Sequence, residues 1–168
     1  MESAVTEPFR GPPAPGSPPP ATVLTCIDHV GIACRDLAGA VARYESVFGL
    51  VVAHRERNEE QGVSEAILQV PGTGPASAYL QLLEPLGPDT PVGRFLASRG
   101  EGIHHVGYRV PDITAALASV GGAGVRLIDA RPRHGSMGAS IAFLHPKDTG
   151  GVLTELVQPA EYPGKPDL

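Results

Sequence analysis

Two histidines and two oxygen-bearing side chains interrupt apolar stretches of the sequence at matching places in its two halves. Imidazole nitrogens and side-chain oxygens are donors that divalent transition metals accept in proteins. Brought together by the fold, these side chains would form a metal site with four protein ligands. The four residues and the stretches that contain them are His29 in "IDHVGIACRDL", Gln81 in "AYLQLLEPL", His105 in "IHHVGYRVPDI" and Glu155 in "VLTELVQPA".

The stretches around these residues repeat along the chain. The stretch that contains His29 aligns with that of His105 at a shift of 76 positions, from 29 to 105. The stretch that contains Gln81 aligns with that of Glu155 at a shift of 74 positions, from 81 to 155. Because a small difference in loop length reconciles the two shifts, we interpret the chain as one duplicated unit of about 75 residues.

Each unit is predicted to contain a strand, a helix and then about three strands. Asp36 precedes apolar residues at helical spacing and Gly49 follows them, which is typical of a capped helix, and Asp112 and Gly121 repeat this design in the second unit. Short segments rich in Val, Ile and Leu follow each helix and favour strands. Residues 90–99 are predicted to form a helix that links the units.

Strand alternation determines which faces these side chains occupy. Neighbouring residues of a strand point to opposite faces, so His105 shares a face with Gly107 while His104 points away from it, into packing or a supporting hydrogen bond. We expect the glycine beside each histidine to leave room for a ligand. Pairing of the two units about a pseudo-twofold axis would bring all four polar residues together. Four separately hydrogen-bonded strand residues remain an alternative.

The composition describes one ordinary globular domain. The chain has 168 residues, 42% hydrophobic and 18% charged, with a net charge of -5 and no run of Lys and Arg, which argues against nucleic acid or an anionic membrane as its partner. No apolar stretch reaches the roughly 18 residues of a membrane span, and no secretory leader is evident, so we expect a cytoplasmic location. We predict a disordered Pro-rich arm at 1–22, one domain at 23–160 and a tail at 161–168.

Five segments of the chain, in order, resemble the methylmalonyl-CoA epimerase family of the vicinal oxygen chelate superfamily. The resemblance runs from about residue 24 to 158 and implies an α+β fold, in which two tandem βαβββ modules at about 24–86 and 101–160 form a cupped mixed sheet, commonly as a homodimer. The segments are "IDHVGIA", "EEQGVSEAIL", "LQLLEPL", "GEGIHHVGYRV" and "FLHPKDTGGVLTELVQ".

The resemblance also implies a site and a reaction. The metal ligands would be His29, Gln81, His105 and Glu155, and the metal would be Co²⁺, with Mn²⁺, Ni²⁺ or Zn²⁺ as other options. The substrate would be the small-molecule thioester methylmalonyl-CoA, epimerised at the carbon between carboxylate and thioester, with the metal stabilising the enolate.

Glu65 takes a role only through the resemblance. On the bare pattern, a solvated carboxylate on an edge strand explains it equally well. In the family, this glutamate matches a catalytic base. Epimerisation removes a proton from one face of a carbon and returns one to the other, so Glu65 and Glu155 would flank that carbon, one ionised and one protonated.

Other functions of the same superfamily remain alternatives. A glyoxalase-like metal-dependent lyase or isomerase normally carries glutamate where this chain has Gln81. A dioxygenase would use two histidines and one carboxylate with open positions on the metal. A non-catalytic module that binds small drug molecules would share the fold without needing four metal ligands, so metal content separates it from the enzymes.

Overall fold

The computed structural model describes residues 23–74 and 77–160, so the predicted arm at 1–22 and tail at 161–168 lie outside the described residues. Two short 3-10 turns, Ser136–Gly138 and Pro146–Asp148, stand beside strands of the second half. In chain order the helices and strands are β1 (Cys26–Ala33), α1 (Leu37–Phe48), β2 (Val51–Asn58), β3 (Val63–Gln69), β4 (Tyr79–Pro85), α2 (Pro91–Arg99), β5 (Gly102–Arg109), α3 (Ile113–Gly122), β6 (Arg133–His134), β7 (Ser140–Leu144) and β8 (Thr154–Gln158).

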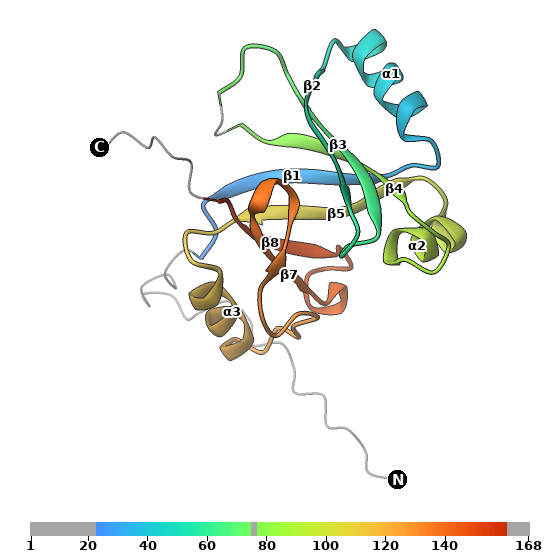
Figure 1. The fold of residues 1–168 in the computed structure, drawn as a ribbon. Helices are drawn as coiled ribbons and strands as arrows, with labels where there is room; N and C mark the ends of the chain where they lie inside the picture. Colours follow the sequence, from blue (N-terminus) through green and yellow to red (C-terminus); the bar gives the residue numbers. More distant parts are fainter. Residues whose placement is uncertain (1–22, 75–76, 161–168) are drawn as a thin grey trace.

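All the strands of the described residues belong to one mixed sheet whose two halves have the same strand order. The sheet runs β2-β3-β4-β1-β5-β8-β7-β6, so β1 and β5 are its central pair (Figure 1). β1 and β5 are antiparallel, whereas β1 pairs with β4, and β5 with β8, in parallel. The predicted fold class, two βαβββ units that form one curled sheet, is therefore confirmed.

The helices α1 and α3 cover one face of the sheet and leave the other face to the polar residues. The cluster under α1 includes Ala66 and Leu82, and the cluster under α3 includes Leu156. Each of these residues is a chain neighbour of a predicted site residue, Glu65, Gln81 or Glu155. Because strand neighbours point to opposite faces, burying the apolar neighbour under a helix turns the polar residue toward the opposite, site-bearing face.

The linking helix α2 packs on the site-bearing face instead. Its residues Val92 and Leu96 form a buried cluster with Ala33 of β1, Val63 of β3 and Leu83 of β4. The helix begins at the predicted place, with the side chain of its N-cap residue accepting a hydrogen bond from the backbone of the first turn. It therefore closes one end of the hollow in which the site lies. None of the helices within the described ranges is long and apolar enough to cross a membrane.

The capped ends of α1 and α3 explain where these helices begin. The carboxylate of Asp36 accepts a hydrogen bond from the backbone of Gly39 at 3.0 Å, and Asp112 caps α3 in the same way at 2.9 Å. Gly49 ends α1 with a left-handed φ of 70°. The predicted stop at Gly121 is wrong, because α3 runs on through Gly122 and the left-handed glycine follows later in the loop.

Removing the cap of α1 should destabilise the protein. We expect Asp36→Ala to lower the free energy of unfolding by about 1 kcal/mol, because a backbone N–H of the first turn loses its acceptor. Asp36→Asn keeps a side-chain acceptor and should retain most of that stability. Urea unfolding of the three proteins measures both effects, and equal losses for the two variants would contradict the capping argument.

Candidate metal centre and active site

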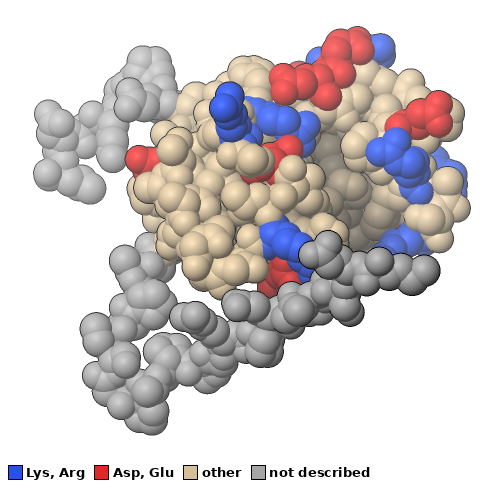
Figure 2. Space-filling view, turned by 90° about the horizontal axis from the view of Figure 1, so that it is seen from below, with Lys and Arg blue, Asp and Glu red and all other residues tan. Residues whose placement is uncertain are grey.

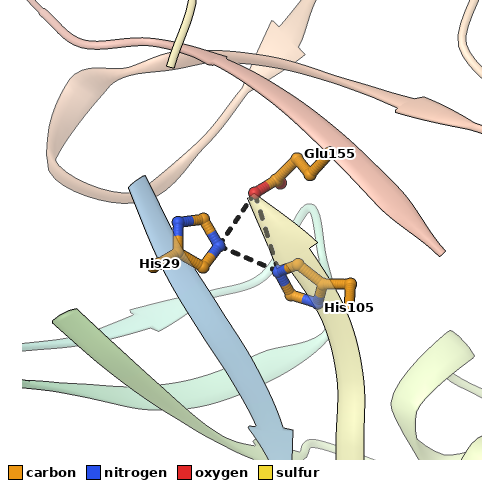
Figure 3. Close-up of side chains that lie close together, drawn as sticks. All are labelled: His29, His105 and Glu155. Atoms are coloured by element: carbon orange, nitrogen blue, oxygen red, sulfur yellow. Dashed lines mark hydrogen bonds and ion pairs between the residues drawn. The ribbon is translucent and has the colours of Figure 1, made fainter. Parts of the chain in front are cut away.

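Three predicted ligands converge from three strands of the sheet. His29 comes from β1, His105 from β5 and Glu155 from β8, and their side chains point toward one another (Figure 3). The Nε2 atoms of the two histidines are 2.9 Å apart, and they lie 3.0 and 3.6 Å from Oε2 of Glu155. All three side chains are buried. Among the described residues they form the one group of three or more histidine, cysteine, aspartate or glutamate side chains that could hold a metal ion.

The glycines beside the two histidines allow the rings to meet. In the β1–β5 register, His29 faces Gly107 and Gly31 faces His105. A Cβ atom on Gly31 would lie 2.3 Å from the ring of His105, and one on Gly107 would lie 2.4 Å from the ring of His29. The expectation that these glycines make room for a ligand is therefore corrected: each makes room for the histidine of the other half.

The donor set fits a divalent cation. Two donor atoms bound to one ion at about 2.1 Å lie about 3.0–3.4 Å apart for octahedral or tetrahedral angles, close to the spacings observed here. The carboxylate of Asp28 lies 2.9 Å from Nδ1 of His29, and an ionised carboxylate can only accept, so the proton of this ring is on Nδ1. Nε2 faces His105 and Glu155, so a cation bound there would replace the second proton that the charged ring carries on this nitrogen.

Gln81 adds an unpaired oxygen on the same face. Its amide nitrogen donates to Oε2 of Glu65 at 2.7 Å and to Oγ of Ser136 at 3.0 Å. Its amide oxygen is buried and has no hydrogen-bond partner within the described part of the chain. Leaving a buried acceptor unpaired is unfavourable, so this oxygen is available as a ligand. The assignment of Gln81 as the fourth metal ligand rests on this oxygen and remains a proposal.

The charges around the histidines favour a bound cation. Burial alone would lower the pKa of His29, but hydrogen bonds to Asp28 and Glu155 and their negative charges raise it to about 9. Burial alone would raise the pKa of Glu155, yet its hydrogen bonds to His105 and His29 lower it to about 2. Burial lowers the pKa of His105. The centre therefore holds an ionised carboxylate together with a strong local attraction for positive charge.

Glu65 is buried and has an unusual environment for a carboxylate. It is 1% exposed and lies on β3, which has β2 and β4 on its two sides, so the solvated edge-strand reading is wrong. Burial raises its pKa to about 7, and the neighbouring carboxyl of Glu56 adds to the rise, while hydrogen bonds from Ser136 and Gln81 oppose it. Near neutral pH this group can therefore either accept or donate a proton.

Several residues of the site were missed from the sequence. Ser136 donates a hydrogen bond to Glu65 from a turn 71 positions away, and no pattern in the sequence marks that serine. Glu56 lies directly opposite Glu65 on β2, which only the strand register could reveal. Asp28 precedes His29 directly, and the repeat contains the signal for its importance, because His104 precedes His105 in the same way.

His104 does not point away from the site as strict alternation predicts. The pairing of β1 with β5 shifts between Gly31 and Ile32, so a β-bulge lies beside His104. Its Nδ1 atom lies 2.9 Å from Nδ1 of His105, and its ring packs edge-on against Phe95 of α2. The expected supporting hydrogen bond is therefore present, and it joins His104 to the predicted ligand His105.

A largely apolar cavity of about 170 Å³ adjoins the centre. It is bounded by strands of both halves and by α2, and its polar lining consists of Glu60, Gln61, His104, His105 and Arg133. In a space-filling view, one face of the molecule is hollowed, and Lys and Arg side chains lie on several sides of the hollow (Figure 2). The apolar lining consists of Val63, Leu83, Pro91, Val92, Ile128, Phe143 and Leu153.

Comparisons with known proteins agree with this architecture. Residues 28–143 match the Glyoxalase/Bleomycin resistance protein/Dioxygenase superfamily. An ethylmalonyl-CoA/methylmalonyl-CoA epimerase of Cereibacter sphaeroides is 37% identical over 134 residues, which are 79% of this chain and 96% of that protein. The chain therefore belongs to the glyoxalase/bleomycin resistance protein/dioxygenase superfamily and, within it, to the family of the methylmalonyl-CoA epimerases.

Solved structures of methylmalonyl-CoA epimerases also superpose on this chain. A variant of the Streptomyces coelicolor methylmalonyl-CoA epimerase in complex with 2-nitronate-propionyl-CoA superposes with a TM-score of 0.78 at 51% identity, covering 82% of this chain and 96% of that one. The methylmalonyl-CoA epimerase from Mycobacterium tuberculosis superposes with a TM-score of 0.79 at 42% identity, covering 84% and 93%.

The close approach at Gly107 yields a prediction about metal binding. We expect Gly107→Ala to displace the His29 ring, to destabilise the protein by about 1–3 kcal/mol through overpacking, and to weaken the binding of Co²⁺. Gly121→Ala is the matched control, because its Cβ would only make ordinary contact with Leu127, at 3.5 Å. Thermal unfolding and Co²⁺ titration measure the two effects, and unchanged Co²⁺ binding by the Gly107 variant would contradict the close-approach argument.

Proposed function

We propose that this chain is a metal-dependent epimerase that interconverts the two epimers of methylmalonyl-CoA by two-base proton transfer. The observation that carries the proposal is a pair of buried carboxylates on one face of the sheet with opposite proton affinities. Glu155 is ionised beside two histidines, with its pKa lowered to about 2, whereas burial raises the pKa of Glu65 to about 7. Inverting a carbon requires one group that accepts a proton and another that donates one.

We infer that His29, Gln81, His105 and Glu155 hold a divalent ion in the working enzyme. When bound, this ion supplies positive charge that stabilises the negative charge developing on the thioester as its α-proton leaves, by several kcal/mol. The fit of the site to such an ion rests on the converging nitrogen and oxygen atoms of both histidines and Glu155, and on the unpaired amide oxygen of Gln81.

The chain's own residues orient the proton-transfer groups. Gln81 and Ser136 both donate hydrogen bonds to Glu65, which fixes its carboxyl group and leaves it little freedom to rotate. Burial keeps water from this carboxyl group, so its proton affinity stays in the range useful at neutral pH. The apolar side chains that line the neighbouring cavity suit the alkyl substituent of the acyl group.

The identity of the metal, the homodimer and the cytoplasmic location remain predictions. The residues suit Co²⁺, but Mn²⁺, Ni²⁺ and Zn²⁺ accept the same nitrogen and oxygen donors. The homodimer and the cytoplasmic location follow from the family resemblance and the sequence, respectively. An acyl-CoA substrate agrees with the Lys and Arg side chains around the hollow in Figure 2, because coenzyme A carries phosphate groups.

A direct assay tests the proposed function. The Co²⁺-loaded protein is incubated in deuterated water with one epimer of methylmalonyl-CoA, and stereochemistry and deuterium uptake at the α-carbon are followed together. We expect inversion accompanied by uptake of one solvent deuteron. A protein that binds metal and releases a different product would support the glyoxalase-like alternative. Metal-free binding of small molecules without turnover would support the binding module.

Glu65→Gln tests the two-base scheme. The change keeps size and hydrogen bonding but removes the base, so we expect inversion to fall by about 10²- to 10⁴-fold while Co²⁺ binding persists. Glu155 remains, so one epimer should still exchange its proton with retention, faster than it inverts. Glu59→Gln, in an exposed carboxylate paired with Arg57, is the control and should leave the rate unchanged. Wild-type inversion by the Glu65 variant would exclude this residue as a base.

A further inference from the structure

The residue that directly precedes each ligand histidine contacts the back of its ring. Asp28 precedes His29, and its Oδ1 lies 2.9 Å from Nδ1 of that ring. His104 precedes His105, and its Nδ1 lies 2.9 Å from Nδ1 of that ring. Positions 28 and 104 correspond under the same shift of 76 that relates the two histidines. Both copies of the duplicated unit therefore place a supporting residue directly before the histidine. This residue is a carboxylate in the first copy and an imidazole in the second.

We propose that Asp28 and His104 are paired positioning residues, which fix the nitrogen that each ligand histidine presents to the metal and which set unequal donor strengths for the two. The inference rests on the proposed metal site. An ionised carboxylate behind an imidazole raises the basicity of the opposite nitrogen, whereas a neutral acceptor mainly fixes its orientation. His29 is thus the stronger donor and His105 the weaker one.

The proton arrangement behind His105 follows from hydrogen-bond chemistry. Nε2 of His105 faces Nε2 of His29 and the carboxylate of Glu155, so it needs its lone pair to bind a cation. The proton of the neutral ring is then on Nδ1 and is donated to Nδ1 of His104. His104 must accept with that nitrogen and keep its own proton on Nε2. A His104 that donated instead would force the proton of His105 onto the metal-facing nitrogen.

Asp28, which supports His29, is a charged residue held by contacts with Arg109 of the second half of the chain. Asp28 is 1% exposed. Arg109 of β5 donates to its Oδ2 through Nε and Nη2, each at 2.8 Å. The ring of Tyr79, on β4, stacks on His29 with the centroids 5.1 Å apart and the planes 17° apart. These contacts fix both the carboxylate and the imidazole that it supports.

The support behind His105 is uncharged and anchored by α2. The ring of His104 packs edge-on against Phe95, with the centroids 5.0 Å apart. An imidazole in this place accepts a hydrogen bond without adding negative charge beside Glu155. The charge of Asp28 behind His29 is compensated by Arg109, whereas the partners of His104 among the described residues are His105 and Phe95, so a carboxylate in that place would add an uncompensated negative charge near Glu155.

The test replaces both supports by the same neutral acceptor. Asn can accept a hydrogen bond at either position, but it has no charge. We expect Asp28→Asn to weaken Co²⁺ binding, because the charge behind His29 is lost, and His104→Asn to retain near-normal binding, because a neutral acceptor persists. His104→Leu removes the acceptor and should weaken Co²⁺ binding by about 10- to 100-fold. Competition with a chelator gives the dissociation constants, and visible absorption of bound Co²⁺ reports its ligand field.

Matched measurements separate positioning from folding. Thermal unfolding of each metal-free variant reports stability, and Phe95→Leu, which alters the packing of His104 but keeps the hydrogen bond, should bind Co²⁺ nearly as well as the unchanged protein. If His104→Leu fails to fold, comparing the Co²⁺ affinities of Asp28→Asn and His104→Asn still tests whether the two supports are unequal. Equal Co²⁺ affinities for those two proteins would overturn the unequal supports.

These measurements test the positioning pair separately from the proposed epimerase function. Metal affinities and Co²⁺ spectra require no substrate, so the predicted order of affinities in a protein without epimerase activity would support the positioning pair and reject the function. An unchanged protein that fails to bind Co²⁺, Mn²⁺, Ni²⁺ or Zn²⁺ would overturn the positioning pair. Unaltered Co²⁺ binding by His104→Leu would overturn the role of His104.

Discussion

The antiparallel pairing of β1 with β5 is the constraint on which the site depends. These strands are the first of each duplicated unit, and their register sets each histidine opposite a glycine of the other strand. Without a side chain at Gly31 and Gly107, the rings of His29 and His105 can turn toward each other across the pair. The candidate metal site therefore lies at the junction of the two halves, and each half contributes one of its two histidines.

Burial of opposite charges at this junction determines the electrostatics of the site. Removing carboxylates from water is unfavourable unless positive charge or hydrogen-bond donors compensate for it. Glu155 lies beside two imidazoles, and Asp28 accepts hydrogen bonds from His29 and also from Arg109, so the pKa values of both carboxyl groups are lowered. Glu65 has hydrogen-bond donors but no ion-pair partner among the residues that the structure describes, and burial raises its pKa. The same cost of burial therefore leaves Glu155 ionised and gives Glu65 a higher proton affinity, as the proposed metal binding and proton transfer require.

Residues along the strands alternate between the hydrophobic core and the site. Leu82 and Leu156 pack beneath the helices, and their neighbours Gln81 and Glu155 face the opposite side of the sheet. Each strand thus contributes to the core and to the site in alternate residues. Where the alternation fails, at the bulge beside His104, this residue contacts His105, a proposed metal ligand.

The sequence by itself determined the fold class, the N-caps Asp36 and Asp112, and the convergence of His29, His105 and Glu155, because repeats, caps and strand periods are local patterns. Only the tertiary structure decided what surrounds those residues. Ser136 reaches Glu65 across 71 positions. The bulge turns His104 toward His105. Such contacts depend on the register between strands and on burial, which no local pattern contains, and they set the proton affinities on which the chemistry depends.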